Sequence, residues 1–271
     1  MKKLKYGSIQ SGLGSIKGDK ILVCGHDLSS DLMGKIDAAA LYYLEVTGKL
    51  PSPAENSLIN AMIVAIAEHG MMPSVIASRM TIMGAPESFQ GAVAAGLLGA
   101  GDVFVGPTSN VAYLLQVESK AFKGNNEEKA NALVAQYFEK KKRIPGLGHP
   151  HHEIDPRAEK LLELQDELGI KNNYSELMLA VQKASIDCIG KHLTFNAVAA
   201  IGSIASDIGL SWKAVRGIGL IARTIGLIGH VLEEIEQPAA PTIWELALNK
   251  TEYLDSNSSL KNGLNSRRKS K

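Results

Sequence analysis

The chain has 271 residues, 29 basic against 28 acidic side chains, and a formal net charge of +1. This length supports one large domain or two small ones, and the balanced charge and 5% aromatic content argue against nucleic acid as a partner. Cys24 and Cys188 are too few for a disulfide framework or a cysteine-rich zinc site. Because no secretion signal and no uninterrupted run of 18 apolar residues is found, we expect a soluble, cytoplasmic protein without a membrane-spanning helix.

The first part of the chain predicts a flexible arm followed by helices. Residues 1–20 carry four glycines and three serines without apolar periodicity. From Asp31, apolar residues recur at three- and four-residue spacing until Gly48, which is typical of a helix. The segment 52–55, Ser-Pro-Ala-Glu, then combines an N-cap, a proline in the first turn and a capping-box glutamate. A second helix is therefore predicted from there to about Gly70.

Helical patterns continue to the end of the folded region. A helix is expected from Pro73, and the stretch 90–101 is rich in alanine and glycine, which suits close helix packing. Chain breakers at 123–128 and 144–148 enclose an amphipathic segment at 130–141. Further helices are expected at 156–169, 176–189, 196–207 and 212–234. No segment alternates apolar and polar residues over a useful length, so the sequence predicts an all-α protein without a substantial sheet.

The composition divides the chain into three regions. Residues 1–20 are the predicted arm, and 21–254 form the predicted helical domain, with a smaller helical subdomain around 123–215. Residues 255–271 are polar and basic and predict a disordered tail. The alternative for this tail is contact with an anionic partner.

His69 stands in the segment Ala-Glu-His-Gly, at the C-terminal end of an apolar helix. The negative end of a helix dipole favours the protonated imidazole. A cationic imidazole could hold a carboxylate or donate to a carbonyl oxygen. The alternative is a histidine that serves only to cap the helix end.

A second candidate region is the loop at 146–157. Gly146 and Gly148 let the backbone approach a ligand. Asp155, followed by proline, starts the next helix and places Arg157 in its first turn, where a carboxylate or phosphate is favoured. Three histidines lie within 149–152, but no known metal-ligand spacing accompanies them, so we expect no metal.

The third candidate is Arg223, within the glycine-flanked apolar helix 217–230. An arginine in so apolar a helix needs an anion as its partner when it is buried. That anion could be a carboxylate of the protein or one of a substrate.

These motifs together resemble the citrate synthase superfamily. Gly-Leu-Gly-His149 followed by Asp-Pro-Arg157 resembles its G-x-G-H and D-P-R signature. Ala-Glu-His69 is similar to its earlier A-[DE]-H segment, and Ile-Ala-Arg223 with a glycine-flanked histidine is similar to its late substrate-binding helix. The order and spacing agree over about 28–245.

Within that superfamily the chain is similar to the short citryl-CoA lyases and to the citryl-CoA lyase module of ATP-citrate lyase. It lacks the N-terminal helices of full citrate synthases. Gly-Asp-Val-Phe at 101–104 looks like the G-D-x-F of that module. Gly-Pro-Thr-Ser at 106–109 replaces the P-L-H of synthases, whose histidine stabilises the acetyl-CoA enolate. These differences favour the lyase branch.

The resemblance implies an all-α homodimer that binds a coenzyme A thioester and a di- or tricarboxylate, without a metal. It implies that His69 and His149 are the catalytic residues and contact the oxaloacetate or citryl part, with His149 taking the hydroxyl proton. Arg157 and Arg223 would clamp carboxylates, and Asn196 would belong to the substrate-binding set. The residues implied to lie against the adenine end of CoA are Ile144, Pro145, Gly146, Leu147 and Gly148.

Two positions depart from the family pattern. Asn196 matches the first residue of the family's N-V-D segment, but the catalytic aspartate position falls on Val198. General acid–base catalysis is typically worth about 10²–10⁴-fold, and valine cannot supply it. Asp187 or Glu153 could substitute, the local alignment could be shifted, or the reaction could have changed. The segment 237–241 also has no counterpart of the arginine that the family contributes across the dimer.

The leading interpretation is a lyase that cleaves citryl-CoA, or a related 3-hydroxy-3-carboxyacyl-CoA, into acetyl-CoA and oxaloacetate or another keto acid. One alternative is a compact citrate synthase that runs the condensation. The other is a homologue that binds CoA esters without turnover, an interpretation favoured by Val198.

Overall fold

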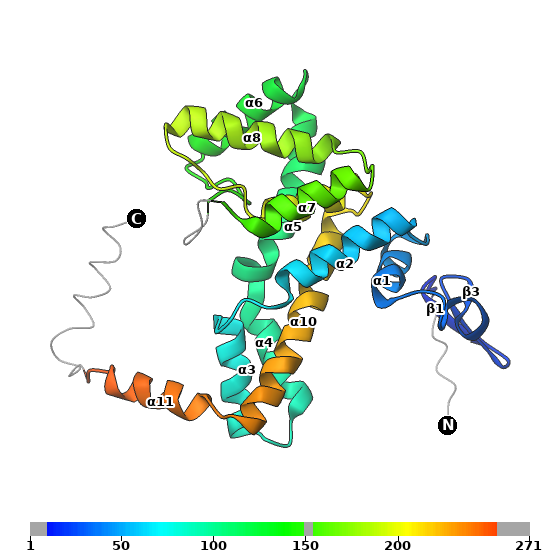
Figure 1. Cartoon of the computed structure of the whole chain (residues 1–271), viewed down its shortest axis with the longest axis vertical. Coiled ribbons are helices and arrows are strands. Elements are labelled where there is room, and N and C mark those ends of the chain that lie inside the picture. The colour runs from blue at the N-terminus through cyan, green and yellow to red at the C-terminus, as the bar shows by residue number, and fades with distance from the viewer. Residues whose placement is uncertain (1–9, 149–153, 254–271) are drawn as a thin grey trace, which may run out of the picture. The chain divides into compact units, whose positions relative to one another are not determined.

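The computed structural model describes residues 10–148 and 154–253, and it is predominantly α-helical, as predicted (Figure 1). The α-helices are α1 (Ala38–Thr47), α2 (Pro53–Ala67), α3 (Pro73–Gly84), α4 (Phe89–Ala100), α5 (Gly106–Gln116), α6 (Asn126–Glu139), α7 (Pro156–Glu167), α8 (Asn173–Ile189), α9 (Ala197–Asp207), α10 (Trp212–Glu236) and α11 (Ala240–Asn249). The shorter elements are β1 (Gly14–Lys17), β2 (Lys20–Val23), β3 (His26–Asp27), the π-helical turns η1 (Leu28–Leu32) and η2 (Gly101–Val105), and the 3₁₀ turn η3 (Glu118–Ala121).

A small antiparallel sheet corrects the prediction for the N-terminal arm. β1 pairs with β2, and β2 pairs with β3. The turn between β1 and β2 has two residues, and Gly18 adopts a φ of 58°, which glycine reaches without strain and tight hairpins require. Residues 14–20 therefore belong to a hairpin that was not predicted, because turn geometry rather than apolar periodicity closes it; the flexibility of the arm stays a prediction.

The local capping signals identified two helix starts correctly. The Ser52 hydroxyl accepts from the Glu55 N–H, and the Glu55 carboxylate accepts from the Ser52 N–H at 2.7 Å. Asp155 accepts from the Arg157 N–H at 3.1 Å at the start of α7. The first helix begins at Ala38 rather than near residue 31, because the Asp37 carboxylate caps its first turn.

Two helices and one helix start were not predicted. Both α5 and α11 carry a proline in the first turn, which is a start signal that glycine- and alanine-rich surroundings obscured. The helix α6 begins at Asn126, four residues before the predicted start, because Asn125 and Glu128 form a capping box.

The chain divides into two compact units. The first consists of residues 1–70 and 100–226, and the second of 71–99 and 227–271. Helices between 123 and 215, expected to form a smaller subdomain, belong to the first unit together with α1 and α2. Their separation as a subdomain stays a prediction.

The core of the first unit is built by apolar faces of α2, α9 and α10, with α5, α6 and α8 forming a second cluster. In Figure 1, α6 and α8 lie side by side, and they pack against each other. Complete burial of each Leu or Ile side chain contributes about 1.5–3 kcal/mol. The helices α5 and α9 approach closely at Gly202, where a Cβ would lie 2.5 Å from the Val111 Cβ.

In the second unit, a buried ion pair fastens α3 to the end of α10. The Arg79 Nη1 donates to the Glu234 carboxylate at 2.9 Å, and both side chains are 3% exposed. Glu234 also accepts from the N–H groups of Ala239 and Ala240, where α11 begins. One carboxylate therefore joins α3, α10 and α11.

Two stretches within the described residues are long and apolar enough to cross a membrane, judged by length and composition alone. They are Phe89–Ala121 and Trp212–Glu236. The expectation that the chain has no membrane-spanning helix stays a prediction. Core helices of soluble proteins have the same property, so it assigns no membrane location to this chain.

Candidate functional site

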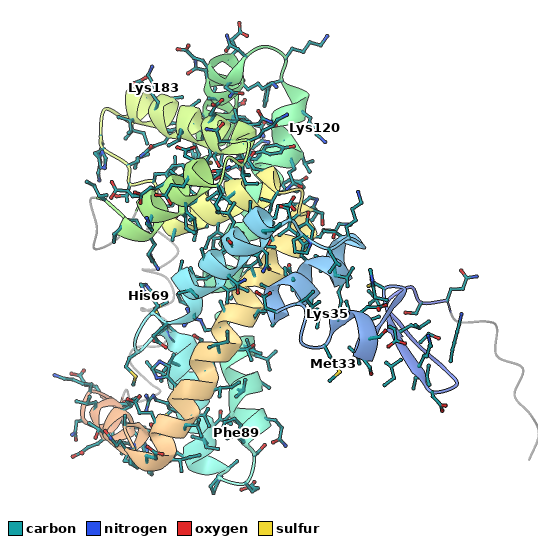
Figure 2. All side chains as sticks on the ribbon, turned by 45° about the vertical axis from the view of Figure 1, so that its right-hand side comes forward. Met33, Lys35, His69, Phe89, Lys120 and Lys183 are labelled. Atoms are coloured by element: carbon teal, nitrogen blue, oxygen red, sulfur yellow. The ribbon has the colours of Figure 1, made fainter. Side chains whose placement is uncertain are left out.

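His69 lies in the connection that follows α2, as Figure 2 shows. The helix ends at Ala67, and Glu68 is extended, with φ −121° and ψ 143°. The Glu68 carboxylate accepts from the N–H groups of His69 at 2.8 Å and Gly70 at 2.6 Å. This local turn presents the His69 imidazole beyond the helix end.

Two arginines lie close enough to His69 to act on its protonation. Burial lowers the pKa of His69, and the charges of Arg157 and Arg223 lower it further, against weaker opposing effects of Asp155 and Glu68. The helix end was expected to favour a protonated His69, whereas burial and the two guanidinium charges shift its pKa in the opposite direction. The three predicted residues form one electropositive site.

Arg223 is the least satisfied member of this site. Its Nη2 donates to the Ile66 carbonyl oxygen at 3.4 Å, whereas its Nη1 is buried without a hydrogen-bond partner in the described part of the chain. Burial lowers the pKa of Arg223, while Glu68 opposes that shift. A buried cationic donor without a partner costs free energy that an incoming anion can recover. This geometry favours a substrate carboxylate as the partner of Arg223.

A glycine lets α10 approach the loop that carries His69. A Cβ at Gly226 would lie 2.2 Å from the Ala67 carbonyl oxygen and 3.2 Å from the Glu68 carboxylate. Replacing Gly226 by alanine is expected to lower the free energy of unfolding by about 1–3 kcal/mol, because the backbone must move to admit the methyl group. Chemical denaturation measures this loss.

The matched control for that variant is Gly229→Ala on the same helix, where a Cβ meets no atom within 4 Å. This control is expected to gain about 0.5–1 kcal/mol, the usual effect of alanine for glycine in a helix. Equal effects of the two substitutions would contradict the close packing at Gly226.

Arg157 is held by the residue that starts its own helix. Its Nε and Nη2 each donate to one oxygen of the Asp155 carboxylate, both at 2.9 Å. Asp155 is fully buried, whereas the Arg157 side chain stays 28% exposed. The guanidinium is therefore fixed in direction and still accessible to a ligand, which suits two-point binding of a carboxylate.

Asn196 helps to hold the loop at 144–148, which contains Gly146 and Gly148 and is called the glycine loop below. Its Oδ1 accepts from the N–H groups of Val198 and Ala199, and its Nδ2 donates to the Gly148 carbonyl oxygen at 2.8 Å. Its backbone N–H donates to the Gly146 carbonyl oxygen at 3.2 Å. Because its side-chain groups are engaged internally, Asn196 positions the loop, and its substrate-binding role stays a prediction.

A cavity of about 430 Å³ adjoins the glycine loop. Its floor is apolar, and its lining residues are Phe138, Lys142, Arg143, Ile144, Leu147, Gly148, Ser185, Ile189, Lys191 and Leu193. Three of the five predicted CoA-binding residues are in this set. Pro145 and Gly146 are not, and a Cβ at Gly146 would lie 2.8 Å from the Ala199 side chain.

Three cations of this lining were missed in the sequence. Lys142 and Arg143 immediately precede the glycine loop, and this run of basic residues could have indicated positive charge beside it. Lys191 comes from the connection after α8, and its proximity follows from the fold alone. The cavity therefore combines an apolar floor with positive charge, which suits a nucleotide carrying phosphates.

Other predicted residues contribute less to the described site. His149 and Glu153 lie outside the described residues. Val198 is half-buried in the first turn of α9, and Asp187 is exposed near the end of α8. Within residues 10–148 and 154–253, no group of three or more His, Cys, Asp or Glu side chains could hold a metal ion.

Comparison with known proteins places this arrangement in context. Residues 27–244 match the family described as "Citrate synthase, C-terminal domain". The structure of citryl-CoA lyase from Hydrogenobacter thermophilus is similar, with a TM-score of 0.83 and 29% identity, covering 92% of this chain and 95% of that one. The ATP citrate lyase of Methanosaeta concilii, solved in complex with (3S)-citryl-CoA, shares the fold, with a TM-score of 0.74 and 20% identity over 95% of this chain and 44% of that one.

Curated relatives are citrate synthases. That of Deinococcus radiodurans is 26% identical over 193 residues, which is 69% of this chain and 49% of the relative. That of Synechocystis sp. is 26% identical over 163 residues, which is 58% of this chain and 39% of the relative. The chain spans half or less of the length of these two relatives.

Proposed function

Because the chain belongs to the citrate synthase family, we propose that it is a lyase that cleaves citryl-CoA, or a related 3-hydroxy-3-carboxyacyl-CoA, to acetyl-CoA and oxaloacetate. The similarity to a citryl-CoA lyase over nearly the full length of both chains supports this choice within the family.

The observation that carries the proposal is the electropositive site of His69, Arg157 and Arg223. The buried Nη1 of Arg223 has no partner in the described part of the chain, and Arg157 presents a fixed, partly exposed guanidinium. Citryl-CoA carries two free carboxylates and a hydroxyl group. Two arginines can pair with the carboxylates, and charge-assisted hydrogen bonds of this kind are roughly twice as strong as neutral ones.

In the proposed reaction, the hydroxyl proton leaves to a base, which the family resemblance assigns to His149. The bond between the hydroxyl-bearing carbon and the thioester methylene then breaks, and the hydroxyl carbon becomes the keto group of oxaloacetate. The electron pair of the broken bond forms the enolate of acetyl-CoA, which takes a proton on carbon. Val198 cannot supply that proton.

We place the CoA part of the substrate in the cavity beside the glycine loop. The apolar floor suits the adenine, and Lys142, Arg143 and Lys191 suit the phosphates. The double variant Lys142→Ala, Lys191→Ala is expected to raise KM for a CoA ester about tenfold, since each exposed phosphate contact is worth up to about 1 kcal/mol. Steady-state kinetics with and without added salt measure this loss.

The same double variant is expected to bind citrate with unchanged affinity, because these lysines lie apart from the arginine pair in the proposed assignment. The control variant Lys120→Ala, Lys160→Ala removes two lysines that do not line the cavity and should leave KM unchanged. An unchanged KM in the cavity variant would contradict this placement of CoA.

His69 is expected to make citrate affinity depend on pH. Its pKa in the ligand-free protein lies below the usual 6.5, so the imidazole is neutral above that pH. A bound carboxylate favours the imidazolium, so binding takes up a proton between the free and bound pKa values, and affinity rises as pH falls from 7.5 towards 6. The gain is at most about tenfold per pH unit. Calorimetric titration of wild type and His69→Gln isolates this effect, because the titration of citrate itself is common to both; parallel pH profiles would contradict it.

A second candidate is a citrate synthase that runs the condensation, which the curated relatives favour. The test is to supply the purified protein with citryl-CoA, or with acetyl-CoA and oxaloacetate, in separate assays. The proposal expects oxaloacetate from citryl-CoA at a higher kcat/KM than free CoA from the condensation. The reverse ranking would favour the synthase, and binding of citryl-CoA without turnover would favour a non-catalytic homologue.

The homodimer implied by the resemblance remains part of the proposal. Large apolar side chains are exposed on α10 and α11, including Leu232, Ile235, Trp244, Leu246 and Leu248. Such side chains are suited to an interface between subunits.

A further inference from the structure

One buried carboxylate joins the substrate-binding arginine to a second helix. The Asp155 Oδ1 accepts from the Arg157 N–H at 3.1 Å and from its Nε at 2.9 Å. The Oδ2 accepts from the Arg157 Nη2 at 2.9 Å and from the Ala197 N–H at 2.8 Å. Asp155 and Ala197 are 42 residues apart, so this contact ties the start of α7 to the start of α9.

The hydrogen bonds at this junction leave no open helix end. The first N–H of α9 belongs to Ala197 and is bound by Asp155, and the next two are bound by Asn196. The fourth, on the N-cap residue Asn196, donates to the Gly146 carbonyl oxygen at 3.2 Å. All four N–H groups that a helix leaves without intrahelical partners are therefore engaged. Because these N–H groups are engaged, a substrate anion at this junction must bind to side chains. The direction of the Arg157 guanidinium therefore affects how well that anion binds.

The carboxylate is also unsuited to carrying a proton. Burial acts to raise the pKa of Asp155, but hydrogen bonds from Arg157 and from the Ala197 N–H outweigh it and hold that pKa below its usual range. Its side chain is fully buried, and each oxygen already accepts two hydrogen bonds. Asp155 therefore does not take over the role of the family's catalytic aspartate, whose position is occupied by Val198 in this chain.

We infer that Asp155 is a positioning residue that sets the direction of Arg157 and the start of α9 together, and so determines affinity for the substrate carboxylate. The inference rests on the proposed function insofar as Arg157 binds that carboxylate. A carboxylate can accept four such bonds, whereas an amide of the same shape must turn its NH₂ group towards two donors. Asp155→Asn is therefore the informative substitution.

The first readout needs no ligand. Hydrogen exchange of the Arg157 Nε–H and the Ala197 N–H, followed by NMR, is expected to accelerate at least tenfold in Asp155→Asn. The matched control is Glu163→Gln on the same helix, whose exposed carboxylate pairs with Lys160. Unchanged exchange of both groups in Asp155→Asn would overturn the inference.

The second readout is citrate affinity by calorimetry, with steady-state kinetics on citryl-CoA. A positioning role predicts at least a tenfold loss of affinity and a larger change in KM than in kcat. It also predicts that adding Asp155→Asn to Arg157→Ala lowers citrate affinity little further, because both substitutions disrupt the same pair of Arg157 and Asp155. Unchanged citrate affinity would overturn the inference, as would a fall in kcat alone with an altered pH profile, which indicates a proton carrier.

If Asp155→Asn does not fold, Arg157→Lys replaces it. Lysine keeps the charge but cannot bridge both oxygens of Asp155. At least a tenfold loss of citrate affinity supports the inference, and unchanged affinity overturns it. Wild type that binds citrate but does not cleave citryl-CoA would contradict the proposed lyase. The citrate affinities of the variants would then still test the role of Asp155. Wild type that binds neither citrate nor oxaloacetate would contradict both.

Discussion

Replacing Arg223 by methionine is expected to abolish useful citrate binding while leaving the folded chain as stable as wild type or more so. Removing one partner of a buried charge pair typically costs about 2–5 kcal/mol of binding free energy, which corresponds to roughly 30-fold to several thousandfold in affinity. The ligand-free protein keeps Nη1 of Arg223 buried without a partner in the described part of the chain. Its replacement by an apolar side chain is therefore expected to change the free energy of unfolding by about 0 to +1 kcal/mol.

The matched control is Arg216→Met, two turns earlier on α10. Arg216 pairs with Asp102 at 2.7 Å, and both side chains are exposed. Its loss is expected to change stability by less than about 1 kcal/mol and to leave citrate affinity unchanged. Calorimetry and urea denaturation of both variants measure the two effects. A strongly destabilised Arg223→Met would contradict the account, because it would make Arg223 a structural residue.

The second large effect is expected at Arg79 in the second unit. Arg79→Met leaves Glu234 charged and buried, and it is expected to lower the free energy of unfolding by about 3–5 kcal/mol. Arg79 also bonds to the exposed Glu233, but that contact contributes little beside the buried pair. Thermal and urea denaturation measure the loss.

The comparison for Arg79 is Lys160→Met, which breaks an exposed ion pair with Glu163 on α7. That change is expected to cost less than about 0.5 kcal/mol. Recovery of stability in the double variant Arg79→Met, Glu234→Gln would confirm that the buried Glu234 carboxylate, left without its partner, causes the loss of stability. Equal costs for Arg79→Met and Lys160→Met would contradict it.

The features that could be predicted from the sequence are those decided by neighbouring residues. The N-caps at Ser52 and Asp155 follow from hydrogen bonds across two or three positions, and both are confirmed. The need of Arg223 for an anion follows from its apolar helix, and its buried, unpartnered Nη1 agrees with that need.

The features that could not be predicted depend on residues far apart in the chain. Local spacing does not indicate the hydrogen bond from the Ala197 N–H to Asp155. It also does not indicate that Lys142 and Lys191 line the same cavity. His69 shows how a local argument fails. The helix stops two residues earlier, and burial beside two arginines decides its pKa. The N-terminal hairpin was missed because a glycine turn, rather than periodicity, closes it.

In the proposed function, this chain breaks a carbon–carbon bond of a citryl-CoA-like thioester. The most direct measurement is the product stoichiometry after incubation of purified wild type with citryl-CoA, determined by mass spectrometry beside His149→Ala. The account predicts one acetyl-CoA and one oxaloacetate for each citryl-CoA consumed by wild type, and at least a hundredfold slower release by the variant. Release of citrate and free CoA would contradict it, because those products come from thioester hydrolysis, and so would oxaloacetate release that His149→Ala leaves unchanged.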